Sequence, residues 1–324
     1  MMKGADTHYV WIDVARLLLC FFVMAVHVGY VFPACGDMID LIGHASVPVF
    51  FVISGFLFGQ KYIPSSVADR GSVVRKYTKR IFVLYAIWTL VYAPITILYL
   101  LNHHDTGSAI LLYLRNVLFV GQNMMSWHLW YLHALIVALL LIHGLFVCRF
   151  GMWMVVGVFL LLFCAGLYIE SADNCFTETY RQILCDTQNG IFRGGLYVSL
   201  GMLLAAVKDK VQGMLYVLPL ILSFVSYMFG IPFYYPLFSF GFVGLLISLP
   251  HQVALSSFAK WSYKASAFIY LSHFLLIVFL QQVLHWDGNF VQSYFIVLPA
   301  SLLVAWAWIR LSEVKSLAFM KSFY

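Results

Sequence analysis

The sequence predicts an all-α, polytopic membrane protein of about ten transmembrane helices with no soluble domain. Of its 324 residues, 63% are apolar and only 10% are charged, whereas soluble domains average roughly 45–50% apolar and about 25% charged residues. A spanning helix needs about 20 apolar residues, so ten helices leave only short connections. Any chemistry must therefore lie among the helices or in those connections.

The uninterrupted apolar windows define the expected spans. They lie at 9–30, 42–60, 81–101, 127–147, 152–169, 191–207, 212–229, 236–250, 265–284 and 293–309. The apolar segment 107–120 is too short to cross comfortably, which favours a re-entrant or interfacial helix. Charges interrupt the first window and no cleavage site follows it, so we expect a retained membrane helix rather than a signal peptide. The whole chain, 1–324, is expected to form a single integral-membrane domain.

Basic residues indicate the orientation. With a cytoplasmic N-terminus, most of the 19 basic residues fall on the inner side, at 61–80, 208–211, 251–264 and the C-terminal end. Acidic residues favour the outer loops. Because positive residues accumulate on the cytoplasmic side of membrane proteins, we expect both termini to be cytoplasmic.

Cysteines and glycines give two further expectations. On this orientation Cys175 and Cys185 lie in an oxidising compartment, which favours a disulfide that closes a short external loop; the alternative is that the external thiols are unrelated and free. The sequence has no C-x-x-C pair and no H-E-x-x-H signature, so no metal site is expected. The pairs Gly55/Gly59 and Gly241/Gly244 are expected to let helices approach closely.

Three titratable residues of the first window share one helical face. At about 100° per residue, Arg16 lies about 20° from His27 and Asp13 about 40° from it. Arg16 and His27 stand roughly 16 Å apart along the axis. Each such side chain costs at least about 2.5–3.5 kcal/mol within a span, so we interpret the stripe as functional. The alternative is that Asp13 and Arg16 neutralise one another and that His27 is a satisfied core histidine.

Four short sequence motifs occur in a fixed order along the chain. They are W-I-D-V-A-R at 11–16 followed by His27, V-P-V-F-F-V-I-S-G-F at 47–56, W-H-L-W-Y-L at 127–132 and I-Y-L-S-H at 269–273. Together they resemble the membrane-bound acyltransferase family 3, whose members commonly transfer acyl groups from acyl-coenzyme A to cell-envelope glycans. The family's ten-helix core agrees with the number of predicted spans.

The sequence departs from that family at the entrance of the third span. There R-K-Y-T-K-R-I-F-V at 75–83 keeps Arg80 but has Tyr77 where the first arginine of a paired motif is expected and Val83 where a proline is expected. Neighbouring bases are expected to supply the lost charge. No extra extracellular domain follows the core, unlike in fused members, which predicts a stand-alone core.

The resemblance and the chemistry of the side chains together predict the site. A buried neutral imidazole beside a hydroxyl takes its proton near neutrality, so His27 is the predicted general base. The predicted catalytic residues are His27, Asp13 and Arg16; those for the acetyl-coenzyme A donor are Arg75, Lys76, Lys79, Arg80, Pro48, Ser54 and Gly55; those for the glycan acceptor are Trp127, His128, Trp130, Tyr131 and His273. The 16 Å between Arg16 and His27 is on the order of an extended pantetheine arm.

Each of these sets has a simpler alternative. The basic cluster is also what an ordinary positive-inside loop contains, and the tryptophans and tyrosine are typical of an aromatic belt at the outer interface. His128 and His273 serve packing equally well, while His133 and His143 are expected to be hydrogen-bonded within the helices. Pro48, Ser54 and Gly55 are expected to shape a kinked or broken helix that opens the donor pathway.

The predicted function is O-acetylation of a polysaccharide or lipid-linked sugar in a bacterial inner membrane, in contact with membrane lipid and without nucleic acid. A transporter or flippase of a lipid-linked glycan or acylated product is the rival class. A single polar stripe and the lack of paired broken helices in two halves argue against that class. A lipid or peptide acyltransferase of the same fold is a third possibility, because the sequences of the loops do not identify the acceptor.

Overall fold

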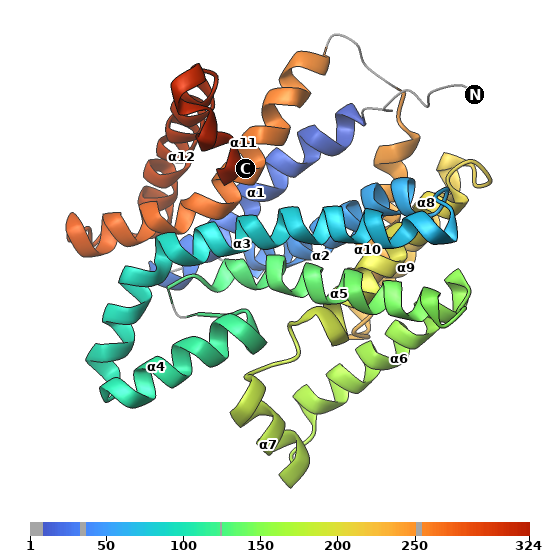
Figure 1. Cartoon of the computed structure of the whole chain (residues 1–324), viewed down its shortest axis with the longest axis horizontal. Helices are drawn as coiled ribbons and strands as arrows, with labels where there is room; N and C mark the ends of the chain where they lie inside the picture. The colour runs from blue at the N-terminus through green and yellow to red at the C-terminus, as the bar shows by residue number, and fades with distance from the viewer. Residues whose placement is uncertain (1–8, 33–36, 124, 251–254) are drawn as a thin grey trace. The chain divides into compact units, whose positions relative to one another are not determined.

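The computed structural model describes residues 9–32, 37–123, 125–250 and 255–324 (Figure 1). Within these residues the chain forms twelve α-helices joined by turns, and no strand. A helix satisfies its backbone hydrogen bonds internally, as a membrane requires. The prediction of an all-α fold is confirmed.

The helices follow one another without long connections. The α-helices are α1 Val10–Val31, α2 Asp37–Tyr62, α3 Val67–His103, α4 Thr106–Arg115, α5 Trp130–Val147, α6 Met152–Ser171, α7 Cys175–Leu184, α8 Gly195–Val207, α9 Val217–Met228, α10 Tyr234–Ser248, α11 Ser256–Val278 and α12 Phe290–Ser312. The short π and 3-10 segments are η1 Asn116–Val120, η2 Trp127–Leu129, η3 Gly190–Gly194, η4 Gly213–Tyr216, η6 Phe279–Val283 and η7 Lys315–Phe323.

Eight helical segments are long and apolar enough to cross a membrane, which confirms a polytopic membrane protein. They are Val10–Val31, Leu41–Tyr62, Val67–His103, Trp127–Val147, Met152–Ser171, Gly190–Val207, Ser256–Val283 and Phe290–Ser312. The other two predicted spans form the shorter apolar segments Gly213–Met228 and Tyr234–Ser248. Segment 107–120 forms the short helix α4 and the turn η1, and its placement at the membrane interface stays a prediction.

The helices divide into two compact units. The first unit contains residues 1–46, 208–322 and 324, and the second contains residues 47–207 and 323. The boundary falls inside α2, beside Pro48. The expectation of a single integral-membrane domain stays a prediction.

In the first unit α1 packs along α11, and the two helices run in the same direction (Figure 1). The Arg16 guanidinium lies over the Tyr263 ring near the start of both helices, at 5.4 Å from its centroid. His27 meets His273 near their other ends. Both helices therefore begin on the same side of a membrane, which agrees with the predicted sidedness of the segments before them, although residues 251–254 lie outside the described residues.

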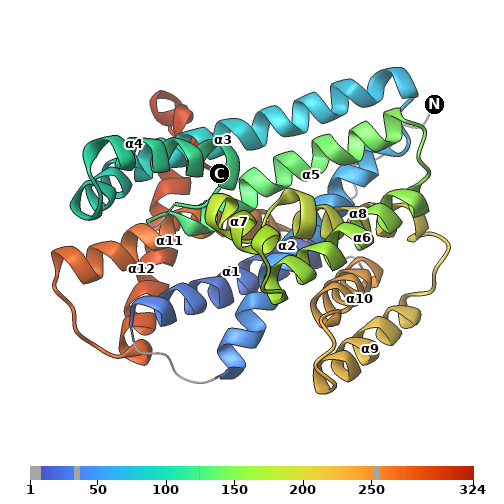
Figure 2. The same ribbon diagram turned by 90° about the horizontal axis from the view of Figure 1, so that it is seen from below.

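In the second unit α3 and α5 run antiparallel, side by side in both views (Figures 1 and 2). Tyr85 meets His133 with ring centroids 5.9 Å apart, and Tyr92 meets His128 at 5.1 Å. His133, one of the two histidines expected to be hydrogen-bonded within the helices, has its Nε2 atom 3.2 Å from the Leu118 carbonyl oxygen. His143 Nδ1 likewise lies 2.9 Å from the Tyr62 hydroxyl, so the prediction that His133 and His143 are hydrogen-bonded is confirmed.

Glycines allow a close helix contact in the second unit, between α2 and α8. A Cβ atom on Gly55 would lie 2.1 Å from the Val198 carbonyl oxygen, and one on Gly201 would lie 2.1 Å from the Val52 carbonyl oxygen. One on Gly59 would meet the Ala205 Cβ at 2.9 Å. The predicted packing role of Gly55 and Gly59 is therefore confirmed, because no larger residue fits at this backbone separation.

The second glycine pair has the same role in the first unit. Cβ atoms on Gly241 and Gly244 would lie 2.9 Å from the Tyr216 carbonyl oxygen and 2.3 Å from its ring, respectively. These glycines of α10 let η4 and α9 pack closely against it, as predicted.

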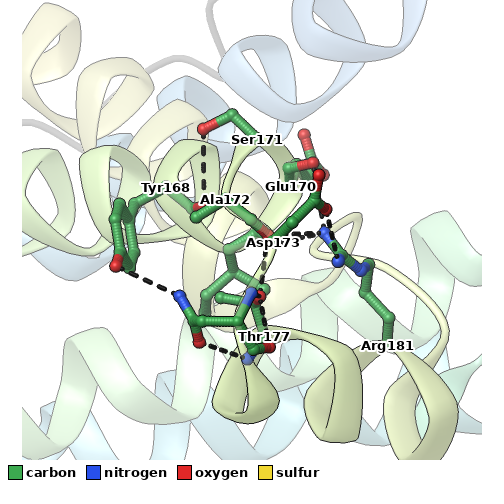
Figure 3. Close-up of polar contacts among 9 residues, drawn as sticks. Tyr168, Glu170, Ser171, Ala172, Asp173, Thr177 and Arg181 are labelled. Atoms are coloured by element: carbon green, nitrogen blue, oxygen red, sulfur yellow. Dashed lines mark hydrogen bonds and ion pairs between the residues drawn. The ribbon is translucent and has the colours of Figure 1, made fainter.

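The turn between α6 and α7 is held by its own side chains (Figure 3). Asn174 and Thr177 form a capping box, in which the Thr177 amide donates to Asn174 Oδ1 at 3.1 Å and the Asn174 amide donates to Thr177 Oγ1 at 3.2 Å. Arg181 Nη1 donates to the carbonyls of Ile169 and Ala172 at 3.0 and 3.1 Å (Figure 3). A cation here also interacts favourably with the negative end of α6.

The predicted disulfide between Cys175 and Cys185 is wrong for this fold. Both thiols are free and exposed. Cys175 begins α7 and Cys185 follows its last residue, so ten residues at about 1.5 Å each separate them by roughly 15 Å along the helix. A disulfide needs Cα atoms within about 7 Å. The capped helix between the two cysteines therefore prevents the bridge.

Candidate active site

Two histidines from α1 and α11 meet within the first unit. The ring centroids of His27 and His273 lie 5.1 Å apart, with an angle of 39° between the ring planes. His273 is only 1% exposed, and His27 is half-buried. The ring of Phe274 contacts His27 edge-on at 5.7 Å. The pair thus combines two titratable rings with an apolar wall, a setting that strengthens any polar interaction made within it.

The tautomer of His273 is set by its own helix. His273 Nδ1 lies 3.0 Å from the carbonyl oxygen of Ile269, one turn earlier. A carbonyl only accepts hydrogen bonds, so Nδ1 carries the proton and donates it. In the neutral ring Nε2 is then the basic nitrogen.

The inner end of the predicted stripe also faces α11. Arg16 Nη1 lies 3.6 Å from Asp13 Oδ1, which is the contact that the alternative of mutual neutralisation predicts. Their side chains are 14% and 10% exposed, and the Arg16 guanidinium also lies over the Tyr263 ring. The helix therefore presents Arg16 and His27 to α11, while Asp13 contacts Arg16 on the same helix.

Two polar residues beside His27 were not singled out from the sequence. Tyr30 lies one turn after His27, with ring centroids 6.2 Å apart, and its hydroxyl lies 3.3 Å from His44 Nε2 of α2. Both Tyr30 and His44 are exposed. The i, i+3 spacing of His27 and Tyr30 was a usable signal, since such residues share a helix face. No sequence spacing links His44 to them.

The predicted donor-binding bases lie in the second unit on a helix rather than in a loop. The helix α3 begins at Val67, because the Ser66 hydroxyl accepts from the Asp69 amide at 3.3 Å and caps it. With 37 residues, α3 is about 55 Å long, which exceeds the roughly 30 Å of a hydrocarbon core. The first turns of α3, which carry these bases, therefore extend beyond the apolar span.

Those bases occupy one side of α3. Arg75, Lys76, Lys79 and Arg80 are all exposed and, at about 100° per residue, lie within an arc of about 140°. The opposite side is packed: the Tyr77 ring meets Phe58 at 5.3 Å. Tyr77, which stands where a family arginine is expected, donates to the Leu57 carbonyl at 3.3 Å. It therefore supports the contact between α3 and α2.

Ser54 and Tyr131, assigned from the sequence to donor and acceptor respectively, are bonded to one another. Their hydroxyls lie 2.7 Å apart, and Tyr131 also donates to the Phe50 carbonyl at 3.3 Å. Since a tyrosine hydroxyl has one proton, Ser54 is then the donor to Tyr131. The two residues form one polar contact between α2 and α5.

The aromatic residues around η2 pack inward. Tyr131 is buried against Phe51, with ring centroids 4.6 Å apart, and Trp130 meets the same ring at 5.6 Å. Trp127 is half-buried, and His128 is 1% exposed. Burial of Tyr131 and His128 does not fit an aromatic belt that faces lipid. An acceptor-binding role for these residues stays a prediction.

The expected break in α2 is not there. The helix runs without interruption from Asp37 to Tyr62 and includes Pro48, Ser54 and Gly55. Proline removes one backbone donor, but a membrane helix tolerates this where its neighbours re-satisfy the chain. The helix is therefore not broken at these residues, while a kink at Pro48 and a donor pathway along α2 stay predictions.

A further polar cluster, which sequence analysis did not identify, lies at the end of α6 and the segment before η3. Glu170 pairs with Arg193 and accepts from the Thr187 hydroxyl. Asp186 accepts two hydrogen bonds from Gln122 Nε2, at 3.0 and 3.1 Å. Burial raises the pKa of the Asp186 carboxyl above its usual value. These contacts tie the connection to α6 and to the segment between η1 and η2, which gives the cluster a structural role.

Comparison with known proteins identifies the family. Residues 9–310 match the acyltransferase 3 family, described as an acyltransferase domain. The chain belongs to the acyltransferase 3 family. Family membership implies an acyltransferase that works with an acyl donor. The residues that carried the resemblance lie on α1, α2, η2 with α5, and α11.

A curated relative is also similar over part of its length. It is a serine/alanine racemase from Enterococcus gallinarum, 28% identical over 211 residues, which cover 61% of this chain and 29% of the racemase. The chain thus spans less than a third of that relative. No solved structure matches the chain.

Proposed function

We propose that this acyltransferase 3 protein is an O-acetyltransferase of a bacterial inner membrane, which moves the acyl group of cytoplasmic acetyl-coenzyme A to a hydroxyl of a cell-envelope or secreted polysaccharide. The observation that carries the proposal is the contact of the half-buried His27, on the polar stripe of α1, with the buried His273. A titratable residue within a membrane span is energetically costly, so its presence indicates a function. The family supplies the reaction class.

The proposed reaction needs one base and regenerates it. His27 accepts the proton of the acceptor hydroxyl as that oxygen attacks the thioester carbon. The new C–O bond forms while the C–S bond breaks, and the proton passes from His27 to the coenzyme A thiolate. Products are the O-acyl glycan and free coenzyme A, so no net proton is released.

The α3 bases are proposed to hold phosphate groups of the donor, and Arg16 is proposed separately, on α1 alone, to contact the donor. Guanidinium groups contact phosphate in a bidentate way, and Arg75 and Arg80 are exposed on one side of α3. Along α1 itself, Arg16 and His27 are separated by roughly 16 Å, on the order of an extended pantetheine arm. This spacing allows a donor anchored near Arg16 to present its thioester to His27.

Acyl transfer by the purified protein tests the proposal directly. The full chain, reconstituted in vesicles, is supplied with labelled acetyl-coenzyme A and a polysaccharide acceptor, and acetyl esters are measured by mass spectrometry. We expect ester formation that depends on the protein. Vesicle uptake of a lipid-linked glycan without ester formation supports the transporter class instead, and transfer to lipid or peptide only changes the acceptor.

Replacing Arg80 is expected to weaken donor binding. Arg80→Ala removes a guanidinium from the exposed face of α3, whereas Arg80→Lys keeps only a point charge and is expected to retain part of the affinity. A charge-assisted hydrogen bond contributes about 1.5–3 kcal/mol, or roughly a 10- to 100-fold change in Kd. Binding of acetyl-coenzyme A is measured by calorimetry.

The matched control for this prediction is Arg310→Ala, at the end of α12. Arg310 is an exposed arginine that lies 3.7 Å from Glu313 and outside the α3 cluster. We expect no change in Kd for that variant. Equal binding by the Arg80→Ala and Arg310→Ala proteins would place the donor phosphates elsewhere.

A further inference from the structure

We propose that His273 is a positioning residue for His27: its Nε2 accepts the Nδ1–H of His27 and so leaves His27 Nε2 as the base that faces the acceptor. This inference rests on the proposed role of His27. It differs from the sequence-based expectation, in which His273 contacts the acceptor. It also gives the I-Y-L-S-H segment at 269–273 a defined task.

The first step of the argument is the fixed proton of His273. Its Nδ1–H donates to the Ile269 carbonyl at 3.0 Å within one turn of α11. The ring is 1% exposed, so water does not compete effectively for that bond. His273 therefore presents an acceptor, Nε2, on the side of the ring away from its own helix.

The second step is the distance between the two rings. An in-line N–H···N hydrogen bond of about 2.9 Å, plus about 1.1 Å from each nitrogen to its ring centroid, places the centroids about 5.1 Å apart. The observed separation is 5.1 Å. His27 Nδ1 and His273 Nε2 are both buried atoms. A rotation of the His27 ring within this contact would bring the two nitrogens together while His273 keeps its bond to the Ile269 carbonyl.

The third step is the chemical consequence. When His273 Nε2 accepts from His27 Nδ1–H, the tautomer of His27 is fixed and its Nε2 keeps the lone pair. As His27 takes the proton of the acceptor hydroxyl, the neutral His273 ring stabilises the imidazolium and keeps its own proton on Nδ1. The proton then passes from His27 Nε2 to the departing thiolate. The Ile269 carbonyl thus orients His273, and His273 orients the base His27, as the third member of a catalytic triad orients its histidine.

Other titratable groups around the pair do not replace His273. From α2, His44 is bonded to the Tyr30 hydroxyl at 3.3 Å. From α1, the Tyr30 ring lies 6.2 Å from His27, and from α11 the Tyr270 ring lies 6.3 Å from His273. Tyr30 and His44 are exposed, whereas His273 is the buried neighbour of His27.

Two substitutions at His273 separate the possible roles. His273→Phe keeps a planar ring without an acceptor, while His273→Gln places an amide oxygen near the position of Nε2. Tyr270→Phe is the matched control. The Tyr270 ring centroid lies 6.3 Å from that of His273, and the substitution keeps this ring but removes its hydroxyl. The full-length variants are reconstituted in nanodiscs with ¹⁵N-labelled histidine.

The readouts are the ¹⁵N signature of His27 and the kinetics of acyl transfer. We expect His273→Phe to shift His27 from a single Nδ1–H tautomer to a mixture and to lower kcat by about 10- to 100-fold, with KM for donor and acceptor within about threefold. His273→Gln is expected to recover most of the tautomer and of kcat. Tyr270→Phe is expected to match the unmodified protein in both.

Each other outcome overturns the positioning role. An unchanged His27 signature in His273→Phe shows that the two rings are only packed together. A rise in the acceptor KM with an unchanged kcat makes His273 an acceptor-binding residue. The ¹⁵N signature is read without turnover, so it reports the pairing even if His27→Gln retains full transfer and the assignment of the base fails.

Discussion

Replacing His27 with glutamine is expected to lower acyl transfer by about 10²- to 10⁴-fold, the range that a positioned general base contributes. Glutamine has a similar size and retains hydrogen bonding, but it does not accept a proton near neutral pH. The side chain of His27 lies against His273 and Phe274, so the contact between α1 and α11 remains filled. The rate is measured with labelled acetyl-coenzyme A and acceptor in vesicles.

Two companion measurements make this result specific. Donor binding and thermal unfolding of His27→Gln are expected to equal those of the unmodified protein, because Arg16 and the α3 bases are untouched. The matched control is His103→Gln at the exposed end of α3, where the histidine contacts the Tyr99 carbonyl and ring of its own helix. Transfer by His27→Gln at the rate of the control protein would assign the base to another residue.

The stripe on α1 was predictable because helical periodicity alone decides which residues share a face. Asp13, Arg16 and His27 lie together whatever surrounds the helix. The neighbour was not predictable, since His273 is 246 residues away from His27 and the sequence offers no period that connects them. The contact between the two rings required the parallel packing of α1 and α11, which is a property of the tertiary fold.

The start of α3 shows a local signal that was available in the sequence. Ser66 and Asp69 stand three residues apart, the spacing of a cap, and they extend the helix back to Val67. Hydropathy alone predicted a span from 81 and a loop before it, because charged residues lower the hydropathy of a segment without preventing helix formation. The basic cluster is therefore presented on a rigid helix, where its four side chains share one side.

The helix break expected at Pro48 and the bridge expected between the cysteines are absent from the described residues for a common reason. In each case a residue type was taken to interrupt or cross-link the chain, whereas the surrounding segment favoured a continuous helix. Apolar neighbours carry α2 through Pro48, and the Asn174/Thr177 box with Arg181 sets α7 between the two thiols. A single helix-breaking residue therefore predicts the end of a helix poorly where capping and burial favour the helix.

The second large effect is expected from Gly55→Ala. The added Cβ atom would lie 2.1 Å from the Val198 carbonyl oxygen and 2.8 Å from its carbonyl carbon, so α2 and α8 must separate. Backbone atoms yield less easily than the end of a flexible side chain. Overpacking of this kind destabilises by about 1–3 kcal/mol or more. We expect a lower midpoint of thermal unfolding in detergent, measured by the exposure of buried thiols such as that of Cys20.

Gly157→Ala on α6 is the matched control, because no atom lies within 4 Å of a Cβ built there. It adds the same methyl group to a long apolar helix of the same unit and is expected to leave the midpoint unchanged. The comparison also tests the sequence-based assignment of Gly55 to the donor site. A Gly55→Ala protein that unfolds like the control but no longer binds acetyl-coenzyme A would favour donor contact over helix packing. A lower midpoint of thermal unfolding in both variants would instead mean that α6 packs against a partner through Gly157. The close approach of α2 and α8 would then be tested by a compensating Val198→Gly change.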